Sequence, residues 1–585
     1  MQKILKYSLI FSIFLFLFLG FFHEISAITQ DLGRHFLLGK IILETHQVPL
    51  TNLFSYTYPN FPFINLHWFS EIIFYLIFKF AGYDTLLLFT VLTVSLSFAL
   101  IFFKSLKKGN IISVAIISIL YLGVLFERTD IRPEIFSFLF LSIFIAILYS
   151  YREKFTKWIF ILPLLILLWV NMHIYFIAGI AILGLFLLDE IVIKRKEIFL
   201  SLKKSKRPPA HLTTLIFILL ISFTMTAFNP NGINGALYPF RVFENYGYAI
   251  EENQNVFFLW NLMNKTTILF FFISASALIL SVLLTIKKIK PVDLLLAVFF
   301  TYLAVSAERN FPLFVFGTFI AFSNSLSLIT EKLFLKIQPL AKLNIFKSII
   351  SILLLSIIFW QIFNIINQKK VGFGVQKGAK DAADFFLSNN LEGPLFNNFD
   401  IGGYLDYRFY PKEKVFVDNR PGEYPASFFQ NVYIPMQSEQ DKFNNLSKTY
   451  NFNVIFFGHT DQTPWGKTFI KQIISNPNWK TVYLDDFVII LVKNSYQNKN
   501  LIDKFEINEG IYQTDYNKFD TNSLYRFLNV FYLISWKKQE IKIYQAILSK
   551  DPNSCLALSN LAQNFINENN PSANIFIARF NRSCK

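Results

Sequence analysis

Asp31, Arg34 and His35 lie close together in the segment TQDLGRHFLLGK (29–40). A carboxylate can accept a proton from a reacting group, and the planar guanidinium of arginine binds carboxylates and phosphates through paired hydrogen bonds. The segment comes soon after the apolar run YSLIFSIFLFLFLGFF (7–22). Ionisable groups at the edge of such a run are costly unless they are paired, hydrated or used, so these residues are candidates for a functional site.

Similar side chains recur at the ends of other apolar runs further along the chain. They are His67, Trp68, Glu71, Arg128, Asp130, Arg132, Asn171, His173 and Arg309. Because carboxylates, histidines, asparagines and arginines occur together there, we expect several helix ends to form one polar cavity. For any single residue, the simpler alternative is a side chain that extends from the end of a span into water.

The elements that must position these residues are transmembrane helices. The chain of 585 residues is 54% hydrophobic and only 16% charged, which is typical of an integral membrane protein. A helix of about 20 apolar residues crosses a hydrocarbon core of about 30 Å. We predict eleven spans, at residues 5–22, 84–103, 111–126, 134–151, 157–169, 174–192, 211–228, 265–286, 292–307, 310–330 and 346–366.

The basic residues predict which side of the membrane each loop occupies. With Lys3 and Lys6 in the cytoplasm, every alternate loop is rich in lysine and arginine, as the positive-inside rule requires. These loops are KSLKKG (104–109), YREKFTK (151–157), KRKEIFLSLKKSKR (194–207), KKIK (287–290) and EKLFLKIQPLAKLNIFK (331–347). The first outer loop (23–83), the candidate site residues and everything beyond 367 are then extracytoplasmic. The short apolar segment HWFSEIIFYLIFKFAG (67–82) is predicted to be a helix in the membrane interface.

Charge, cysteines and the N-terminus exclude other classes. The net charge of +16 is concentrated in the short loops between apolar runs, so it indicates membrane topology and no nucleic-acid surface. The two cysteines, Cys555 and Cys584, indicate neither a thiolate metal site nor a disulfide framework. Although Ala27 resembles a cleavage position, the long apolar core favours a retained anchor over a secretory signal.

The polar C-terminal region is predicted to hold a small α/β domain (367–505) and a helical tail (506–585). Its pattern reads helix (378–390), strand (393–399), strand (414–420), helix (443–450), strand (453–458), helix (467–476) and strands (479–484, 487–493). The Gly402–Gly403 pair lacks phosphate-loop spacing and is interpreted as a turn. Asp418 and Arg420, at the end of a predicted strand, are either ligand groups or a structural pair. In the tail, IKIYQAILSKDPNSCLALSNLAQNFI resembles one tetratricopeptide unit, which must pack on the α/β domain or on a partner.

Four segments carry a resemblance to a known family. They are the segment from TQDLGRHFLLGK to IFKFAG, then IRPEIFSFLFL, LLWVNMHIYFIAGI and FNPNGINGALYPF. In order and spacing over about residues 1–330, the chain resembles bacterial polytopic proteins allied to the GT-C glycosyltransferases, which include protein mannosyltransferases and lipid A aminoarabinose transferases. The segment FDIGGYLDYRFYPKEKVFVDNRPGEYP (399–425) is similar to the soluble domain of the same group. The resemblance implies a mainly α, GT-C-like bundle of about eleven transmembrane helices that carries an extracytoplasmic α/β domain.

The resemblance also implies the chemistry: transfer of a sugar from a polyprenyl-phosphate carrier to an acceptor at the outer membrane face, with inversion at the anomeric carbon. Asp31 matches the acidic residue of the first outer loop and is the expected general base. Arg132, Arg309, Arg128 and Arg34 are the expected ligands of the donor phosphate. His35, His67, Trp68, Glu71, Asn171 and His173 are expected in the substrate pocket. The soluble domain is expected to bind the acceptor or to act as a lid.

Several alternatives stay open at this stage. No cofactor is expected, but a divalent cation held by Asp31 and Asp130 is a minor alternative. The expected partners are the lipid-linked sugar, the bilayer, a glycan, lipid or protein acceptor, and a protein bound through the helical tail. A transporter or flippase of lipid-linked saccharides would need polar residues through the middle of spans. A scaffold without enzymatic activity is the third alternative.

Overall fold

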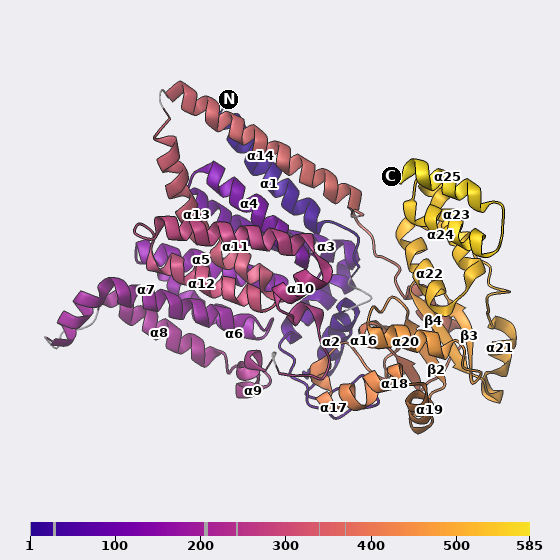
Figure 1. The fold of residues 1–585 in the computed structure, drawn as a ribbon. Helices are drawn as coiled ribbons and strands as arrows, with labels where there is room; N and C mark the ends of the chain where they lie inside the picture. The colour runs from indigo at the N-terminus through magenta and orange to yellow at the C-terminus, as the bar shows by residue number, and fades with distance from the viewer. Residues whose placement is uncertain are drawn as a thin grey trace.

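The computed structural model of the protein describes residues 2–26, 31–203, 209–241, 244–337, 340–368 and 370–584. Ala27, Thr29, Gln30 and parts of two predicted basic loops (204–207 and 338–339) lie outside the described residues. Figure 1 shows a bundle of long helices in indigo and magenta, with the C-terminal elements in orange and yellow packed beside one end of it. The two regions therefore meet along a shared boundary.

Eight helices in the described part of the chain are long and apolar enough to cross a membrane, as a multi-pass membrane protein requires. They are α1 (Gln2–Phe21), α3 (Trp68–Leu106), α4 (Ile111–Leu125), α5 (Glu134–Glu153), α7 (Phe176–Lys203), α11 (Thr266–Thr285), α13 (Phe311–Phe334) and α14 (Leu340–Gln368). The other predicted spans correspond to the shorter apolar helices α6 (Leu162–Val170), α8 (Ala210–Met225) and α12 (Pro291–Ser306). Each predicted span falls on a helix, and the count of eleven crossings stays a prediction.

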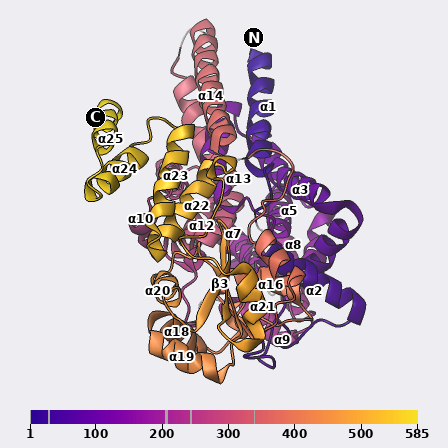
Figure 2. The same ribbon diagram turned by 90° about the vertical axis from the view of Figure 1, so that its right-hand side faces the viewer.

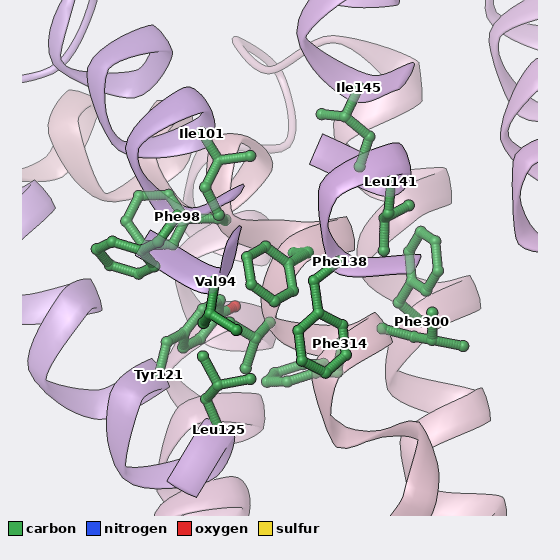
Figure 3. Packing of buried hydrophobic residues seen from close by; sticks show 14 of the residues in the cluster. Val94, Phe98, Ile101, Tyr121, Leu125, Phe138, Leu141, Ile145, Phe300 and Phe314 are labelled. Atoms are coloured by element: carbon green, nitrogen blue, oxygen red, sulfur yellow. The ribbon is translucent and has the colours of Figure 1, made fainter. Parts of the chain in front are cut away.

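The helices pack around a core of large apolar side chains. Figure 3 shows Val94 and Phe98 of α3, Tyr121 of α4, Phe138 of α5 and Phe314 of α13 meeting in this core. Truncation of one of these side chains would leave a cavity and cost stability. The packed core therefore fixes the positions of the helices and of their ends.

The predicted interface segment (67–82) is the first part of α3. At Gly82 the backbone leaves the helical conformation, with φ 76° and ψ −175°, so Trp68–Leu106 consists of two helical segments joined by a kink. Glycine adopts a positive φ without steric cost, which explains the position of the break. The kink separates the shorter segment, which carries Glu71, from the membrane-spanning remainder.

Short helices connect the spans at the end of the bundle that faces the α/β domain. They are α2 (Leu32–Thr45), η2 (Phe126–Arg128), α9 (Gly232–Leu237), η4 (Tyr238–Phe240), η5 (Glu251–Asn253), α10 (Val256–Met263) and η6 (Glu308–Asn310), while η3 (Lys157–Ile161) precedes α6. Candidate site residues in or next to these connections, or just before a span, are Asp31, Arg34, His35, Arg128, Arg132, His173 and Arg309. His67, Trp68 and Glu71 lie at the start of α3.

The α/β domain is built on a four-stranded sheet with the order β1-β2-β4-β3. β1 and β2 are parallel, whereas β4 is antiparallel to both β2 and β3. The strands are β1 (Leu395–Asn397), β2 (Val454–Gly458), β3 (Trp479–Leu484) and β4 (Val488–Lys493). The accompanying helices are α15 (Lys380–Ser388), α16 (Phe399–Phe409), η7 (Pro421–Glu423), α17 (Ala426–Phe428), η8 (Phe429–Tyr433), α18 (Ile434–Ser438), α19 (Gln440–Thr449), α20 (Pro464–Ile473), η9 (Tyr496–Asn498) and α21 (Lys499–Phe505).

Two predictions for this domain were wrong. The segment 414–420 forms no strand in the sheet, and Val415 makes only an isolated bridge to Ser55 of the first outer loop. Gly402 and Gly403 lie inside α16 and not in a turn. A Cβ on Gly402 would stand 2.2 Å from the carbonyl oxygen of Val417, so glycine permits the close contact between α16 and the segment 414–420.

The helical tail packs on the α/β domain. It contains η10 (Tyr516–Lys518), α22 (Thr521–Ile534), α23 (Lys537–Lys550), α24 (Cys555–Asn567) and α25 (Ala573–Ser583). One hydrophobic core joins residues of α22, α23 and α24 to residues of β2, β4 and α20. A disulfide links Cys555 to Cys584, contrary to the expectation from cysteine number alone. Disulfides persist mainly in oxidising compartments, which is consistent with an extracytoplasmic tail.

The first outer loop attaches the α/β domain to the bundle. The Tyr56 hydroxyl donates to the carbonyl oxygen of Leu395 at 2.9 Å, and the Thr57 hydroxyl donates to that of Phe416 at 2.9 Å. Arg420 pairs with Asp418 (Nη2 to Oδ2, 2.5 Å) and also donates to Asn52 of the loop at 3.2 Å. In Figure 2, α2 and α16 lie next to each other, in agreement with their close packing. The domain is therefore held over the connections of the bundle.

Candidate functional site

A cavity of about 220 Å³ lies between the bundle and the α/β domain. Its walls come from the first outer loop, the ends of several spans, the connection from η4 to η5, η6 and the segment 419–423 of the α/β domain. Nine of the eleven predicted site residues line it: Asp31, Arg34, His35, His67, Glu71, Arg128, Arg132, His173 and Arg309. Residues far apart in the sequence therefore meet in one polar space, as the pattern of helix ends predicts.

Asp31 occupies a central position, directly before α2. Its Oδ1 accepts hydrogen bonds from Arg34 Nη2 at 3.1 Å and from Asn419 Nδ2 at 2.7 Å. Its Oδ2 lies 3.9 Å from Arg132 Nη1. Burial opposes ionisation of Asp31, but Arg132 and Arg34 outweigh it and lower the pKa of the carboxyl to about 2. The side chain is an anion at neutral pH and contacts both the bundle and the α/β domain.

The arginines of the bundle are held by acidic and amide side chains. Arg128 Nε donates to Glu134 Oε1 at 3.0 Å, and the same guanidinium also pairs with Glu252. Arg132 Nη1 donates to Glu252 Oε2 at 3.0 Å, and Arg309 Nη1 donates to Asn253 Oδ1 at 3.0 Å. Two buried or partly buried carboxylates thus pair with Arg128 and Arg132, and the Asn253 amide holds Arg309, so the guanidinium groups are fixed in place without a bound anion.

Three histidines line a second part of the wall. His35 Nδ1 lies 2.8 Å from Glu71 Oε1, and Asn65 Nδ2 donates to the other oxygen of Glu71 at 2.7 Å. Burial lowers the pKa of His67 to about 3, and it also holds the pKa of His173 far below the ordinary value. His67 and His173 are therefore neutral at physiological pH and can donate or accept a hydrogen bond.

Within the part of the chain that the structure describes, four buried polar atoms on cavity-lining residues have no hydrogen-bond partner. They are the donors Arg34 Nε and Arg309 Nε and the acceptors Asn419 Oδ1 and Glu423 Oε2. Buried polar groups are almost always paired in folded proteins, so unpaired groups around a cavity indicate places for a polar ligand. The donors lie on the bundle side and the acceptors on the α/β side.

Two predicted pocket residues are placed elsewhere. Trp68 Nε1 donates to Asn171 Oδ1 at 2.8 Å, and neither residue is among those that line the cavity. Asn171 Nδ2 also donates to the carbonyl oxygen of Phe228 at 2.9 Å. This pair ties the start of α3 to the end of α6, which is a structural role.

Asp31 and Asp130, which were considered as ligands of a divalent cation, do not line the cavity together. Asp130 accepts a hydrogen bond from the Ser26 hydroxyl at 2.8 Å and does not line the cavity beside Asp31. Within the ranges that the structure describes, no group of three or more His, Cys, Asp or Glu residues is arranged to hold a metal ion.

Sequence reasoning missed residues in two segments that complete the cavity. Glu252 and Asn253, in η5, bind the arginines, and nothing in the long loop 229–255 distinguished them from its other polar residues. Asn419 and Glu423 belong to the segment DNRPGE, in which polar groups flank a Pro-Gly turn. Polar residues after a predicted strand drew attention to Asp418 and Arg420. The partners of Asn419 and Glu423, however, depend on how the α/β domain docks on the bundle.

The comparisons with known proteins bear on the fold. No family model matches the chain, and no curated protein matches it in sequence. The chain is similar to the archaeal oligosaccharyltransferase AglB from Archaeoglobus fulgidus, whose structure contains an inhibitory peptide and a dolichol-phosphate. That match has 12% identity and a TM-score of 0.56, and it covers 94% of this chain and 86% of that chain. The apo form of the A. fulgidus oligosaccharyltransferase gives 10% identity and a TM-score of 0.52 over 84% of this chain and 74% of that chain.

The chain is also similar to ArnT from Cupriavidus metallidurans, whose structure contains undecaprenyl phosphate. That match has 10% identity and a TM-score of 0.47, and it covers 85% of this chain and 98% of that chain. The two oligosaccharyltransferase matches cover the bundle and most of the C-terminal region together. They confirm the predicted fold, a GT-C-like helical bundle that carries a C-terminal α/β region.

Proposed function

We propose that the protein is a membrane glycosyltransferase that moves a sugar from a polyprenyl-phosphate donor to an acceptor at the extracytoplasmic face of the membrane. The observation that carries the proposal is the cavity in which an ionised carboxylate, Asp31, lies among four arginines of the bundle, two of which keep an unpaired N–H group. The shared fold supports it, because AglB was solved with a dolichol-phosphate. A carboxylate beside fixed cations suits a reaction with a proton to remove and a phosphate leaving group.

The arginines hold the phosphate. Arg132, Arg309, Arg128 and Arg34 supply planar donors, and the unpaired Nε groups of Arg34 and Arg309 are free to bind phosphate oxygens. Because Glu252 and Asn253 already fix two of these guanidinium groups, little reorganisation is needed when charge develops on the leaving group.

Asp31 takes the proton of the acceptor. The acceptor oxygen bonds to the anomeric carbon while the bond from that carbon to the phosphate oxygen breaks. The acceptor proton passes to Asp31, and the electron pair stays on the carrier phosphate. A carboxyl with a pKa of about 2 is a weak base, and its pairing with Arg132 and Arg34 is the reason. A donor phosphate that engages Arg132 offsets this cation and raises the pKa of Asp31, so donor binding prepares the base.

The test is transfer by the purified protein with a panel of polyprenyl-phosphate sugars, followed through release of the carrier phosphate. Asp31→Ala and Arg132→Ala are expected to abolish transfer while expression and folding are preserved. Asp130→Ala and Arg241→Ala are matched controls, because Asp130 does not line the cavity and Arg241 is exposed. Full activity in both Asp31→Ala and Arg132→Ala would refute these roles. Movement of the lipid-linked saccharide across a vesicle membrane without product would instead identify a transporter.

The orientation of the chain follows from the same proposal. The N-terminus is cytoplasmic and the α/β domain extracytoplasmic, because this arrangement places the basic loops inside. The Cys555–Cys584 disulfide supports an oxidising compartment for the tail. Phe155→Cys and Tyr496→Cys, made one at a time, test this orientation with a membrane-impermeant thiol reagent. We expect the cysteine at position 496 to be labelled from outside and the cysteine at position 155 to be protected.

A further inference from the structure

The segment Asn419–Glu423 places the α/β domain inside the cavity, opposite the arginines of the bundle. Asn419 Nδ2 donates to Asp31 Oδ1, while Arg132 lies on the side of Oδ2. Oδ1 of Asp31 therefore contacts the α/β wall as well as Arg34, whereas Oδ2 lies on the side of Arg132. If the arginine wall binds the donor phosphate, the Asn419–Glu423 wall is left for the acceptor.

Glu423 is the ionisable group of this wall that has no assigned role. Its side chain is 4% exposed, its Oε2 accepts no hydrogen bond, and the nearest guanidinium nitrogen, Arg420 Nη1, lies 3.9 Å away. The main chain, in contrast, is fixed, because Asn52 Nδ2 donates to the Glu423 carbonyl oxygen at 3.4 Å. The structure therefore holds the backbone of Glu423 and leaves one carboxyl oxygen unpaired at the cavity.

The surroundings of Glu423 favour a neutral group that carries hydrogen-bond donors. Asn419 Oδ1, Glu423 Oε2 and Asp31 Oδ1 are all oxygen acceptors at or near the same wall. A phosphate or carboxylate offers no donor to them, whereas hydroxyls donate and accept. Tyr238 and Tyr246 add aromatic surface, and the Tyr238 hydroxyl lies 3.2 Å from the place of a Cβ on Gly422. A saccharide presents several adjacent hydroxyls beside an apolar ring face, so it can satisfy these oxygens together.

We propose that Glu423, with Asn419, forms an acceptor subsite for a saccharide hydroxyl group, contributed by the α/β domain. This inference rests on the proposed function, since it names the acceptor of that reaction. Glu423 binds one hydroxyl through Oε2, and Asn419 yields its place at Asp31 Oδ1 to the hydroxyl that reacts. Burial and the nearby Asp418 carboxylate raise the pKa of Glu423 to about 8 against the opposing charges of Arg420 and Arg34. The carboxyl is therefore protonated at neutral pH and can donate as well as accept.

The experiment compares acceptor and donor binding in Glu423 variants. The acceptor probes are methyl α-mannoside, methyl β-galactoside and methyl β-N-acetylglucosaminide, with a serine-containing peptide and glycerol 3-phosphate as other classes. Undecaprenyl phosphate, measured by binding alone, reports the donor wall. Glu423→Ala is expected to raise the KM for the best glycoside about tenfold, with kcat and undecaprenyl phosphate affinity changed by less than about twofold.

Glu423→Gln provides the rescue, because an amide also donates and accepts. In the wild type, the glycoside KM rises as pH passes about 8, where Glu423 loses its proton. In Glu423→Gln this rise disappears, which a purely structural role would not cause. Glu413→Gln is the matched control, a partly buried carboxyl of the same domain that does not line the cavity. Thermal unfolding of each variant confirms that the fold is intact.

Three results would overturn the inference. One is a glycoside KM in Glu423→Ala equal to that of the wild type. Another is an equal loss of undecaprenyl phosphate affinity, which would assign Glu423 to the donor. The third is transfer to the peptide or to glycerol 3-phosphate and to no glycoside, which would exclude a saccharide acceptor. In each case, loss of transfer in Asp31→Ala would leave the proposed function standing.

Discussion

Two buried polar clusters lie at opposite ends of α5, and they differ in how completely their groups are paired. At the start of α5, Glu134 belongs to the cavity. At its other end, a set that we call the paired cluster consists of Tyr149, Arg152, Asp189, Asp293 and Asn324. Tyr149 donates to Asp293 Oδ1 at 2.5 Å, and Asn324 Nδ2 donates to Asp293 Oδ2 at 3.2 Å. Asp189 pairs with Arg152 and accepts from the Val292 backbone N–H at 3.0 Å.

The completeness of hydrogen bonding distinguishes a structural cluster from a candidate ligand site in this protein. Among the described residues, no buried side-chain polar atom of the paired cluster lacks a hydrogen-bond partner, whereas the cavity has four such atoms. A fully satisfied buried network rigidifies the fold, and a partly satisfied one around open space has capacity for a ligand. We therefore expect substitutions in the cavity to change transfer and those in the paired cluster to change stability.

The largest effect is expected for Asp31→Asn. Transfer should fall by about 10²–10⁴, because the amide cannot take the acceptor proton. Some stability is lost with the ion pairs of Asp31, but the fold should persist, since Arg132 keeps its contact with Glu252, so the rate is expressed per folded protein. Carrier phosphate release measures the rate. Asp293→Asn is the matched control in the paired cluster, and a similar loss of specific activity in that variant would break the comparison.

Arg152→Ala is expected to cost about 3–5 kcal/mol of stability, because it leaves the Asp189 carboxylate buried without its cation. Arg132→Ala should cost less, since Glu252 keeps its contact with Arg128. Unfolding of both variants in detergent, followed by tryptophan fluorescence, measures the difference. If Arg132→Ala is destabilised as strongly as Arg152→Ala, the cavity charges serve the fold.

A smaller effect is expected when the hydroxyl of either of two buried tyrosines, Tyr149 or Tyr175, is removed. Tyr149→Phe removes a donor to Asp293 and should cost about 1–3 kcal/mol of stability without changing the activity of the folded protein. Tyr175→Phe removes a hydrogen bond of 2.7 Å to the carbonyl oxygen of Arg309, so it should also weaken binding of undecaprenyl phosphate. Unfolding and lipid binding are measured for both proteins. Equal lipid affinity in the two variants would contradict a phosphate role for Arg309.

The smallest effect on transfer is expected when the pH is lowered from 7 to 4. The pKa of Asp31 is lowered to about 2, so the group stays ionised when the pH falls from 7 to 4. Its ion pairs contribute stability that is fully present above the ordinary pKa of an aspartate and is lost only as pH falls through about 2. The kcat/KM of transfer, which reports the free enzyme, should show no acid limb due to Asp31 in that range. A fall of kcat/KM between pH 7 and pH 4 without loss of folded protein would contradict a base that stays ionised over this range.

The α/β domain shows where local pattern succeeds and where it fails. The strands Val454–Gly458 and Val488–Lys493 were predicted, because continuous apolar runs of this length suit buried strands. The segment 414–420 also begins with an apolar run but docks on the first outer loop, where the Val415 backbone bonds to Phe54 and Tyr56. It meets β1 through the side chain of Asn397 and not through a strand ladder. Tertiary contact overrode the local preference there.

The sequence by itself determined the helices and the chemistry at their ends. Apolar length predicts spans because a backbone in lipid must satisfy its own hydrogen bonds, and ionisable groups such as Asp31 and Arg132 are tolerated there only at a polar site. Only the tertiary structure decided which groups meet: that Trp68 bonds to Asn171 outside the cavity, and that Asn419 and Glu423 enter it. Such contacts depend on how two separately folded surfaces dock, and no local period of the chain encodes that geometry.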